Sequence, residues 1–207
     1  MKRILFVLLI MGLMAPMGLM AQKVYKSSGR VILDMTETGE GTGMPAGAVT
    51  ATSKTAVYNS YTASNTAWLI NTTDNLVGSG INAAVYRKLE IAPMDMAGTS
   101  DTAPMLAATG VDLSWASSFN RCKNLEYPAA GDKGSWRLPT QRELLLMIIM
   151  APAIESFSGV TAFNAGRYWA ATEVNEYSVW CLSFASTDTS GSNAKAEAYR
   201  TRCVREL

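Results

Sequence analysis

Residues 135–144 read Ser-Trp-Arg-Leu-Pro-Thr-Gln-Arg-Glu-Leu, and this stretch predicts a sharp turn into a helix. Thr140 and Glu143 have the spacing of a capping box. In such a box the threonine hydroxyl accepts a hydrogen bond from the Glu143 amide, and the glutamate side chain accepts one from the Thr140 amide. Pro139 favours an extended conformation at the residue before it. The helix is therefore expected to begin after Thr140 and to end near Pro152.

Two charged side chains of this stretch, Arg137 and Glu143, allow two interpretations. They could form a charged functional site, or they could orient the turn and cap the helix. We favour the second, because a helix entrance leaves backbone amides that need hydrogen-bond partners. The predicted structural motif consists of Trp136, Arg137, Pro139, Thr140 and Glu143.

The segments on either side of this motif predict one further helix and three strands. Upstream, apolar residues recur as a single stripe, which predicts a helix capped by Asp112 or Ser114. Downstream, residues 168–172, 179–184 and 199–205 are typical of strands. The helical stripe consists of Trp115, Ala116, Phe119 and Cys122.

The chain before residue 106 has a different character, because it lacks cysteine and is rich in Thr, Ala, Gly, Ser and Asn. Residues 92–104 carry two prolines and predict a linker or long loop. We therefore divide the chain into a β-rich N-terminal region with flexible loops, residues 22–105, and a domain over residues 106–207. The strands expected in the N-terminal region are residues 30–35, 67–70 and 84–91.

Residues 1–21 predict a secretory signal peptide. Lys2 and Arg3 form a short positive segment, the residues after them are uncharged and apolar, and Ala21 precedes a suitable cleavage point. A retained transmembrane helix is the alternative, since the apolar stretch is long enough to span a bilayer. Pro16 and the lack of a following basic cluster favour the signal peptide. We expect no membrane span after processing, and an oxidising compartment for the mature chain.

Composition and charge exclude several classes of function. The 207 residues include 18 Lys and Arg against 17 Asp and Glu, whereas nucleic-acid binders and polybasic membrane-surface proteins need a basic surface. The chain has no histidine, which excludes Ser-His-Asp and Cys-His catalysis and histidine-ligated zinc or haem. Its 3 cysteines cannot form a four-thiolate zinc site. No nucleophile elbow, phosphate-binding loop or dinucleotide fingerprint occurs. We therefore expect a protein that is not an enzyme and uses no cofactor.

An ordered set of motifs resembles one known family. WRLPT-x-x-EL at residues 136–144 is followed by YWAATE at 168–173, VWCLSF at 179–184 and TRCVREL at 201–207. This order is similar to that of the C-terminal domain of collagen-like bacterial surface adhesins, and also to that of the distal domain of fimbrial tip subunits from gut anaerobes. The resemblance implies an α+β fold. Its C-terminal module would be C-type-lectin-like, with two helices and a twisted antiparallel sheet, and the β-rich N-terminal region would precede it.

The resemblance also implies roles for the cysteines. Cys122 and Cys203 match positions that similar modules join by a disulfide, and three reduced thiols are the alternative. Cys181 is additional to the family pattern. It lies on the strand face opposite Trp180 and is expected to be a buried thiol, with intermolecular pairing left open. The triplets by which calcium-dependent lectins of this fold bind the ion are missing, so we expect no metal site of that kind.

Candidate ligand contacts lie in the C-terminal half. Trp169 and Trp180 could stack on sugars, although their apolar neighbours favour core packing. Residues 173–178 and 185–196 are polar loops with small side chains, and they are the candidate ligand-facing surface. The residues considered for ligand contact are Trp169, Trp180, Asn175, Tyr177, Asp188 and Asn193.

Two further patterns in the sequence have simple interpretations. Arg200, Arg202 and Arg205 are read as a solvated strand edge rather than as an anion site. Asp101-Thr102-Ala103 resembles a short bacterial O-glycosylation signal with Thr102 as the acceptor, although a three-residue match is frequent by chance.

Together these features predict an exported, non-catalytic subunit of the cell surface with a binding or adhesive role, and a fimbrial tip is one location to consider. The expected partners are fimbrial or other surface proteins and a glycan or host matrix ligand. A secreted or periplasmic scaffold without a ligand is the alternative. A third reading comes from distant similarity to formylglycine-generating enzymes. Those enzymes need a reactive cysteine pair, which Cys181 and Cys203 could form only on adjacent strands.

Overall fold

The computed structural model describes residues 23–34, 88–173, 177–185 and 190–207. The predicted signal peptide and the predicted strand at residues 67–70 lie outside these ranges. Within them the chain has an α+β fold with short helices and antiparallel sheets, as the family resemblance implies. In this described part no helix combines the length and the apolar character needed to cross a membrane.

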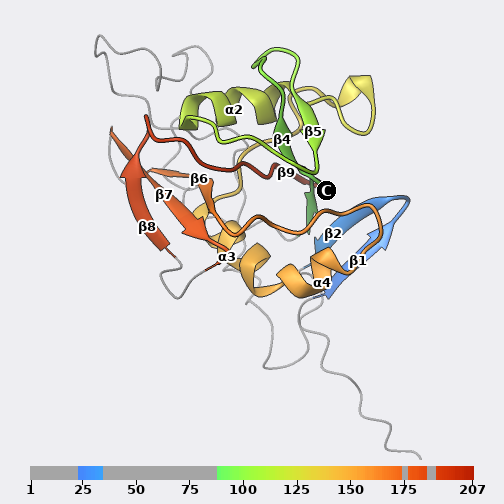
Figure 1. Cartoon of the computed structure of the whole chain (residues 1–207). Helices are drawn as coiled ribbons and strands as arrows, with labels where there is room; N and C mark the ends of the chain where they lie inside the picture. The colour runs from blue at the N-terminus through green and yellow to red at the C-terminus, as the bar shows by residue number, and fades with distance from the viewer. Residues whose placement is uncertain (1–22, 35–87, 174–176, 186–189) are drawn as a thin grey trace, which may run out of the picture.

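The described strands form three antiparallel sheets. The largest has the order β1-β2-β3-β9, the second has the order β6-β7-β8, and β4 pairs with β5. Figure 1 shows the β1–β2 hairpin at one end of the molecule and the β6–β8 sheet at the other. The strands are β1 (Lys23–Ser27), β2 (Arg30–Asp34), β3 (Lys88–Ile91), β4 (Asp95–Ala97), β5 (Met105–Ala107), β6 (Arg167–Glu173), β7 (Ser178–Ser183), β8 (Ser190–Ala194) and β9 (Val204–Glu206).

The helices begin and end close to the predicted positions. The first begins after Ser114, whose side chain accepts a hydrogen bond from the Ser117 amide at 3.3 Å, so Ser114 is the cap and Asp112 is not. The helix after the WRLPT motif ends at Ile149, and Pro152 lies in the first turn of the next helix, where a proline is tolerated. The helical segments are α2 (Trp115–Asn124), the 3-10 turn η5 (Ala130–Asp132), α3 (Gln141–Ile149) and α4 (Ala151–Glu155).

The four-stranded sheet joins residues from both sides of position 105. Strand β3 lies between β2 and β9, with Leu89 opposite Leu33 and Ile91 opposite Val204. This sheet shares one hydrophobic core with α3 and α4, which Figure 1 shows on the side of the molecule opposite α2. The division of the chain at residue 105 stays a prediction, although described strands on both sides of it share this core. The helix residues in the core are Leu144, Met147 and Ile154.

A second hydrophobic core surrounds α2 and the end of the chain. The predicted stripe of α2 is buried in it, which confirms the expected orientation of this helix. Trp136 of the WRLPT motif and Trp169 of β6 complete the core, and both indoles are buried.

Residues 92–104 are not a linker, contrary to the prediction from their prolines. Asp95, Met96 and Ala97 form β4 and are buried. The Met96 amide donates a hydrogen bond to the Thr201 carbonyl at 2.9 Å, so the end of the chain covers this segment. Local composition does not reveal such a distant partner.

The last strand is also shorter than predicted. Strand β9 contains only Val204–Glu206, whereas Tyr199 and Arg200 form isolated bridges with Leu113 and Tyr168. Residues 199–203 bond to a different part of the chain every one or two residues, so they form no continuous ladder with one strand.

Candidate functional site

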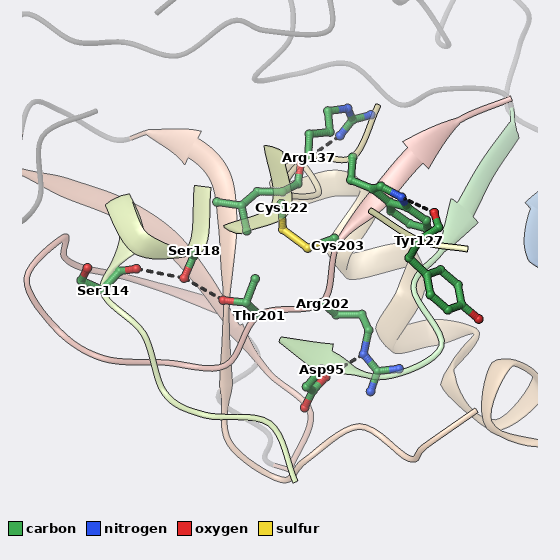
Figure 2. Close-up of a disulfide and its surroundings, with 11 residues drawn as sticks. Asp95, Ser114, Ser118, Cys122, Tyr127, Arg137, Thr201, Arg202 and Cys203 are labelled. Atoms are coloured by element: carbon green, nitrogen blue, oxygen red, sulfur yellow. Dashed lines mark hydrogen bonds and ion pairs between the residues drawn. A yellow bond between two sulfur atoms is a disulfide. The ribbon is translucent and has the colours of Figure 1, made fainter. Parts of the chain in front are cut away.

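A disulfide between Cys122 of α2 and Cys203, next to β9, lies at the centre of the second core (Figure 2). The sulfur atoms are 2.01 Å apart, and the pairing is the one that the family resemblance implies. Close to it, Thr201 donates its hydroxyl to Ser118 Oγ of α2 at 2.7 Å, and Ser118 donates to the Ser114 carbonyl at 2.9 Å. The disulfide therefore joins α2 to the segment that leads into β9.

Arg202, next to the disulfide, is buried rather than solvated. Its Nε donates to Asp95 Oδ1 at 2.6 Å, and its Nη1 donates to the Ala92 carbonyl at 3.3 Å. Tyr168 donates its hydroxyl to the second Asp95 oxygen at 2.7 Å. Burial, together with the negative charge of Asp95, raises the pKa of the Tyr168 hydroxyl above its ordinary value. Tyr168 therefore remains a neutral donor in this cluster.

Arg205 is buried as well, on the other side of the terminal segment. Its Nε lies 2.6 Å from Glu90 Oε2, and Arg30 also donates to this oxygen at 2.6 Å. Its guanidinium stacks over the Trp136 ring at 4.6 Å and pairs with Asp132 at 2.9 Å.

The interpretation of the arginine series as a solvated strand edge is thus wrong for Arg202 and Arg205. Both lie in a segment that other parts of the chain cover from several sides. Arg200 is half-buried and pairs with Asp112 at 2.9 Å between Nε and Oδ1.

The WRLPT motif forms a closed hydrogen-bond network at the start of α3. Arg137 donates Nη1 and Nη2 to the two oxygens of Glu143 at 2.7 and 2.9 Å. Glu143 accepts the Thr140 amide at 2.8 Å, and Thr140 Oγ1 accepts the Glu143 amide at 3.3 Å. Trp136 donates its indole N–H to the Tyr127 carbonyl at 2.8 Å. These contacts confirm that the motif orients a turn and caps a helix.

Electrostatics keep Arg137 charged inside this network. Burial alone would lower its pKa, but the carboxylates of Glu143 and Glu206 outweigh that effect and raise the pKa of the Arg137 guanidinium. The Pro139 carbonyl accepts the Ala171 amide at 2.7 Å, which fixes the turn against β6. The motif leaves no charged group available for chemistry.

The two tryptophans considered for sugar stacking differ in exposure. Trp169 is fully buried and donates its indole N–H to the Leu113 carbonyl at 2.6 Å, so it belongs to the core, as favoured from its neighbours. Trp180 is half-buried and packs against the core that contains α3 and α4.

The predicted ligand loops are smaller than expected. Residues 185–196 include strand β8, which pairs with β7 in the register Trp180 opposite Ser192. This strand is a short run of small polar residues without hydrophobic alternation, and for that reason it was not predicted. Tyr177 is 46% exposed, whereas Asn193 donates its side-chain amide to Cys181 Sγ at 2.9 Å. Asn175 and Asp188 lie outside the described residues.

A buried ion pair joins the ends of these two loops. Lys195, which follows β8, pairs with Glu173 at the end of β6, and the exposed fractions of the two side chains are 6% and 3%. The Lys195 ammonium also lies 4.4 Å from the centre of the Trp115 ring. The loops therefore start from fixed positions on the second core.

Cys181 is a buried thiol with 1% exposure, as predicted, on the β7 face opposite Trp180. Its sulfur accepts from Asn193 and contacts the Gly191 carbonyl at 3.4 Å. In the ranges that the structure describes, no group of three or more Cys, Asp or Glu side chains is placed to hold a metal ion.

A surface hollow that sequence reasoning missed lies beside α2. Its volume is about 330 Å³, and its lining comes from the β4–β5 turn and from the end of the helix. Only Thr102 among its residues carried a sequence signal, and that signal concerned glycosylation. The lining residues are Thr102, Ala103, Pro104, Asn124 and Glu126.

Comparison with known proteins places these features in a family. A search of curated proteins found no match to the chain. A family model described as the Lcl C-terminal domain matches residues 94–205, which is more than half of the chain. The matched region begins just before β4 and includes α2, the WRLPT motif, both disulfide cysteines and the buried Arg202. From strand β4 to Arg205, therefore, the protein belongs to the Lcl C-terminal domain family.

Proposed function

We propose that this protein is an exported cell-surface subunit that binds or adheres to a partner and catalyses no reaction. The observation that carries the proposal is the Cys122–Cys203 disulfide, which lies in the core of the family domain. Disulfides of this kind persist in oxidising compartments outside the cytosol. Membership of the Lcl C-terminal domain family, a family of surface or secreted proteins, supports the same location.

The distribution of charge supports a role without catalysis. In the described residues the charged side chains most deeply buried take part in structural pairs, such as Arg137 with Glu143 and Arg202 with Asp95. Cys203 is bonded to Cys122 and so is not available to react with Cys181, which weakens the formylglycine-generating alternative. A rigid scaffold with exposed loops is typical of binding domains.

Partners follow from the same proposal. A C-type-lectin-like module would present the exposed surface to a glycan or a host matrix protein, and the N-terminal region would connect the subunit to a fimbrium or another surface protein. A periplasmic or secreted scaffold without a ligand remains the competing function.

Protease treatment of intact cells that express the full chain separates these two functions. A surface subunit is digested while a periplasmic control protein stays intact, and untreated cells bind immobilised glycans or matrix proteins more strongly than cells that lack the gene. Protection of the chain until the outer envelope is broken would contradict the proposal. Surface exposure without a difference in binding would favour the scaffold.

A further inference from the structure

The hollow beside α2 is formed by two segments that are held rigidly together. Figure 1 shows the β4–β5 hairpin next to α2. Arg121, which is 5% exposed, donates Nε to Asp101 Oδ1 at 2.7 Å and Nη1 to the Gly98 carbonyl at 2.6 Å. Asn124 donates Nδ2 to the Asp101 carbonyl at 2.9 Å. The turn of the hairpin is therefore fixed to the last turn of the helix.

The turn itself is ordered by a serine side chain. Ser100 Oγ accepts the amides of Thr102 and Ala103 at 3.3 and 3.2 Å, and it lies 3.1 Å from Thr102 Oγ1. A site whose walls are fixed before binding loses little conformational entropy when a ligand enters. The hollow thus has the preformed character of a binding site.

The hollow offers several hydrogen-bond acceptors and one negative charge. The Asp101 carboxylate is neutralised by Arg121, whereas Glu126 is exposed and makes no hydrogen bond or ion pair within the described part of the chain. Asn124 uses one of its two Nδ2 hydrogens on the Asp101 carbonyl, and its Oδ1 can accept a further hydrogen bond. None of the lining residues is cationic. A ligand with a positive charge and hydrogen-bond donors complements the Glu126 carboxylate and these acceptors.

We propose that the hollow binds the guanidinium or ammonium group of a basic side chain presented by a partner protein. The inference rests on the proposed binding function and names the chemistry of its partner. A volume of about 330 Å³ is at the small end of the range for ligand sites, which suits one side-chain head group. A divalent cation such as calcium needs six or more oxygen ligands, and one carboxylate with an amide and a hydroxyl supplies too few.

Nuclear magnetic resonance of the purified chain without residues 1–21 tests the inference at residue level. The probe is an acetylated and amidated Gly-Arg-Gly peptide at low salt, and the control peptide carries citrulline, which has the same shape without the charge. We expect saturable shifts of the amides of Thr102, Ala103, Asn124 and Glu126 with the arginine peptide, and weaker binding as salt rises. Equal binding of the citrulline peptide, or no saturable shift, would overturn the inference.

A pair of matched variants isolates the charge. Glu126→Gln keeps the shape of the side chain and is expected to weaken binding of the arginine peptide about tenfold. Glu197→Gln removes an exposed carboxylate that does not line the hollow and is expected to leave binding unchanged. An unchanged affinity in Glu126→Gln would contradict the proposal, as would shifts at the same amides with a neutral methyl glycoside alone. If cells that express the Glu126→Gln chain adhere normally, the hollow is not the binding site, but the proposed adhesive function still stands.

Discussion

Arg202 and Asp95 are 107 residues apart in the chain and form an ion pair with 2.6 Å between Nε and Oδ1. The exposed fractions of the two side chains are 0% and 4%, so water does not screen the contact. The pair connects the segment next to the disulfide with β4, where the sequence predicted a linker. It therefore holds together two parts of the chain that share no local signal.

Replacing Arg202 with methionine is expected to lower the free energy of unfolding by about 3–5 kcal/mol, because Asp95 would keep a buried charge without its cation. Urea denaturation followed by tryptophan fluorescence measures this change. Arg142→Met is the matched control, since Arg142 is exposed on α3, and it is expected to change stability by less than about 0.5 kcal/mol. Similar losses in the two variants would contradict the structural role of Arg202.

The Cys122–Cys203 disulfide closes a loop of 81 residues and is expected to contribute about 4 kcal/mol to stability by restricting the unfolded chain. The double variant Cys122→Ala with Cys203→Ala should lose this amount in urea denaturation. Cys181→Ala keeps the crosslink and is expected to lose only about 1 kcal/mol. Mass spectrometry of non-reduced peptides identifies the bond directly, and a crosslink that contains Cys181 would show the assignment to be wrong.

The capping box of α3 is tested at Thr140. Thr140→Ala removes the hydroxyl that accepts the Glu143 amide and is expected to cost about 1 kcal/mol of stability. Thr140→Ser keeps the acceptor and should lose clearly less. If serine and alanine destabilise the chain equally, lost packing rather than the cap explains the effect.

Tyr168 makes stability depend on pH in the alkaline range. Its pKa is raised in the folded chain, chiefly by burial and then by Asp95, so above pH of about 10 the unfolded chain releases this proton while the folded chain keeps it. The contribution of Tyr168 is therefore complete below its ordinary pKa and is lost as pH rises, by up to about 1.4 kcal/mol for each pH unit.

Urea denaturation between neutral and alkaline pH, compared for the native chain and Tyr168→Phe, measures this effect. The variant is less stable at neutral pH because it cannot donate to Asp95, but its stability should fall less steeply as pH rises. The control is Tyr25→Phe, which removes the hydroxyl of a half-buried tyrosine on the edge strand β1, and its pH dependence is compared with that of Tyr168→Phe. Parallel curves for the native chain and Tyr168→Phe would show that this proton is not linked to folding.

Glu90 illustrates where prediction from the sequence stopped. The alternation of residues 84–91 places Glu90 on the polar face of its strand, yet Glu90 is only 1% exposed. Arg30 and Arg205, which are 60 and 115 residues away, supply the donors that make its burial possible. The hollow beside α2 likewise has no local signature, because its lining comes from two separate segments, residues 102–104 and residues 124 and 126.

The sequence by itself determined the features that depend on residues three or four positions apart. These are the capping box of Thr140 and Glu143, the buried stripe of α2 and the strands around Trp169 and Trp180, since helix caps and periodicity arise within one or two turns of backbone. Only the tertiary structure decided which charged side chains are buried and which strands meet. A buried charge is stable only when its partner is present, and the partners of Asp95 and Glu90 lie 107 and 115 residues away.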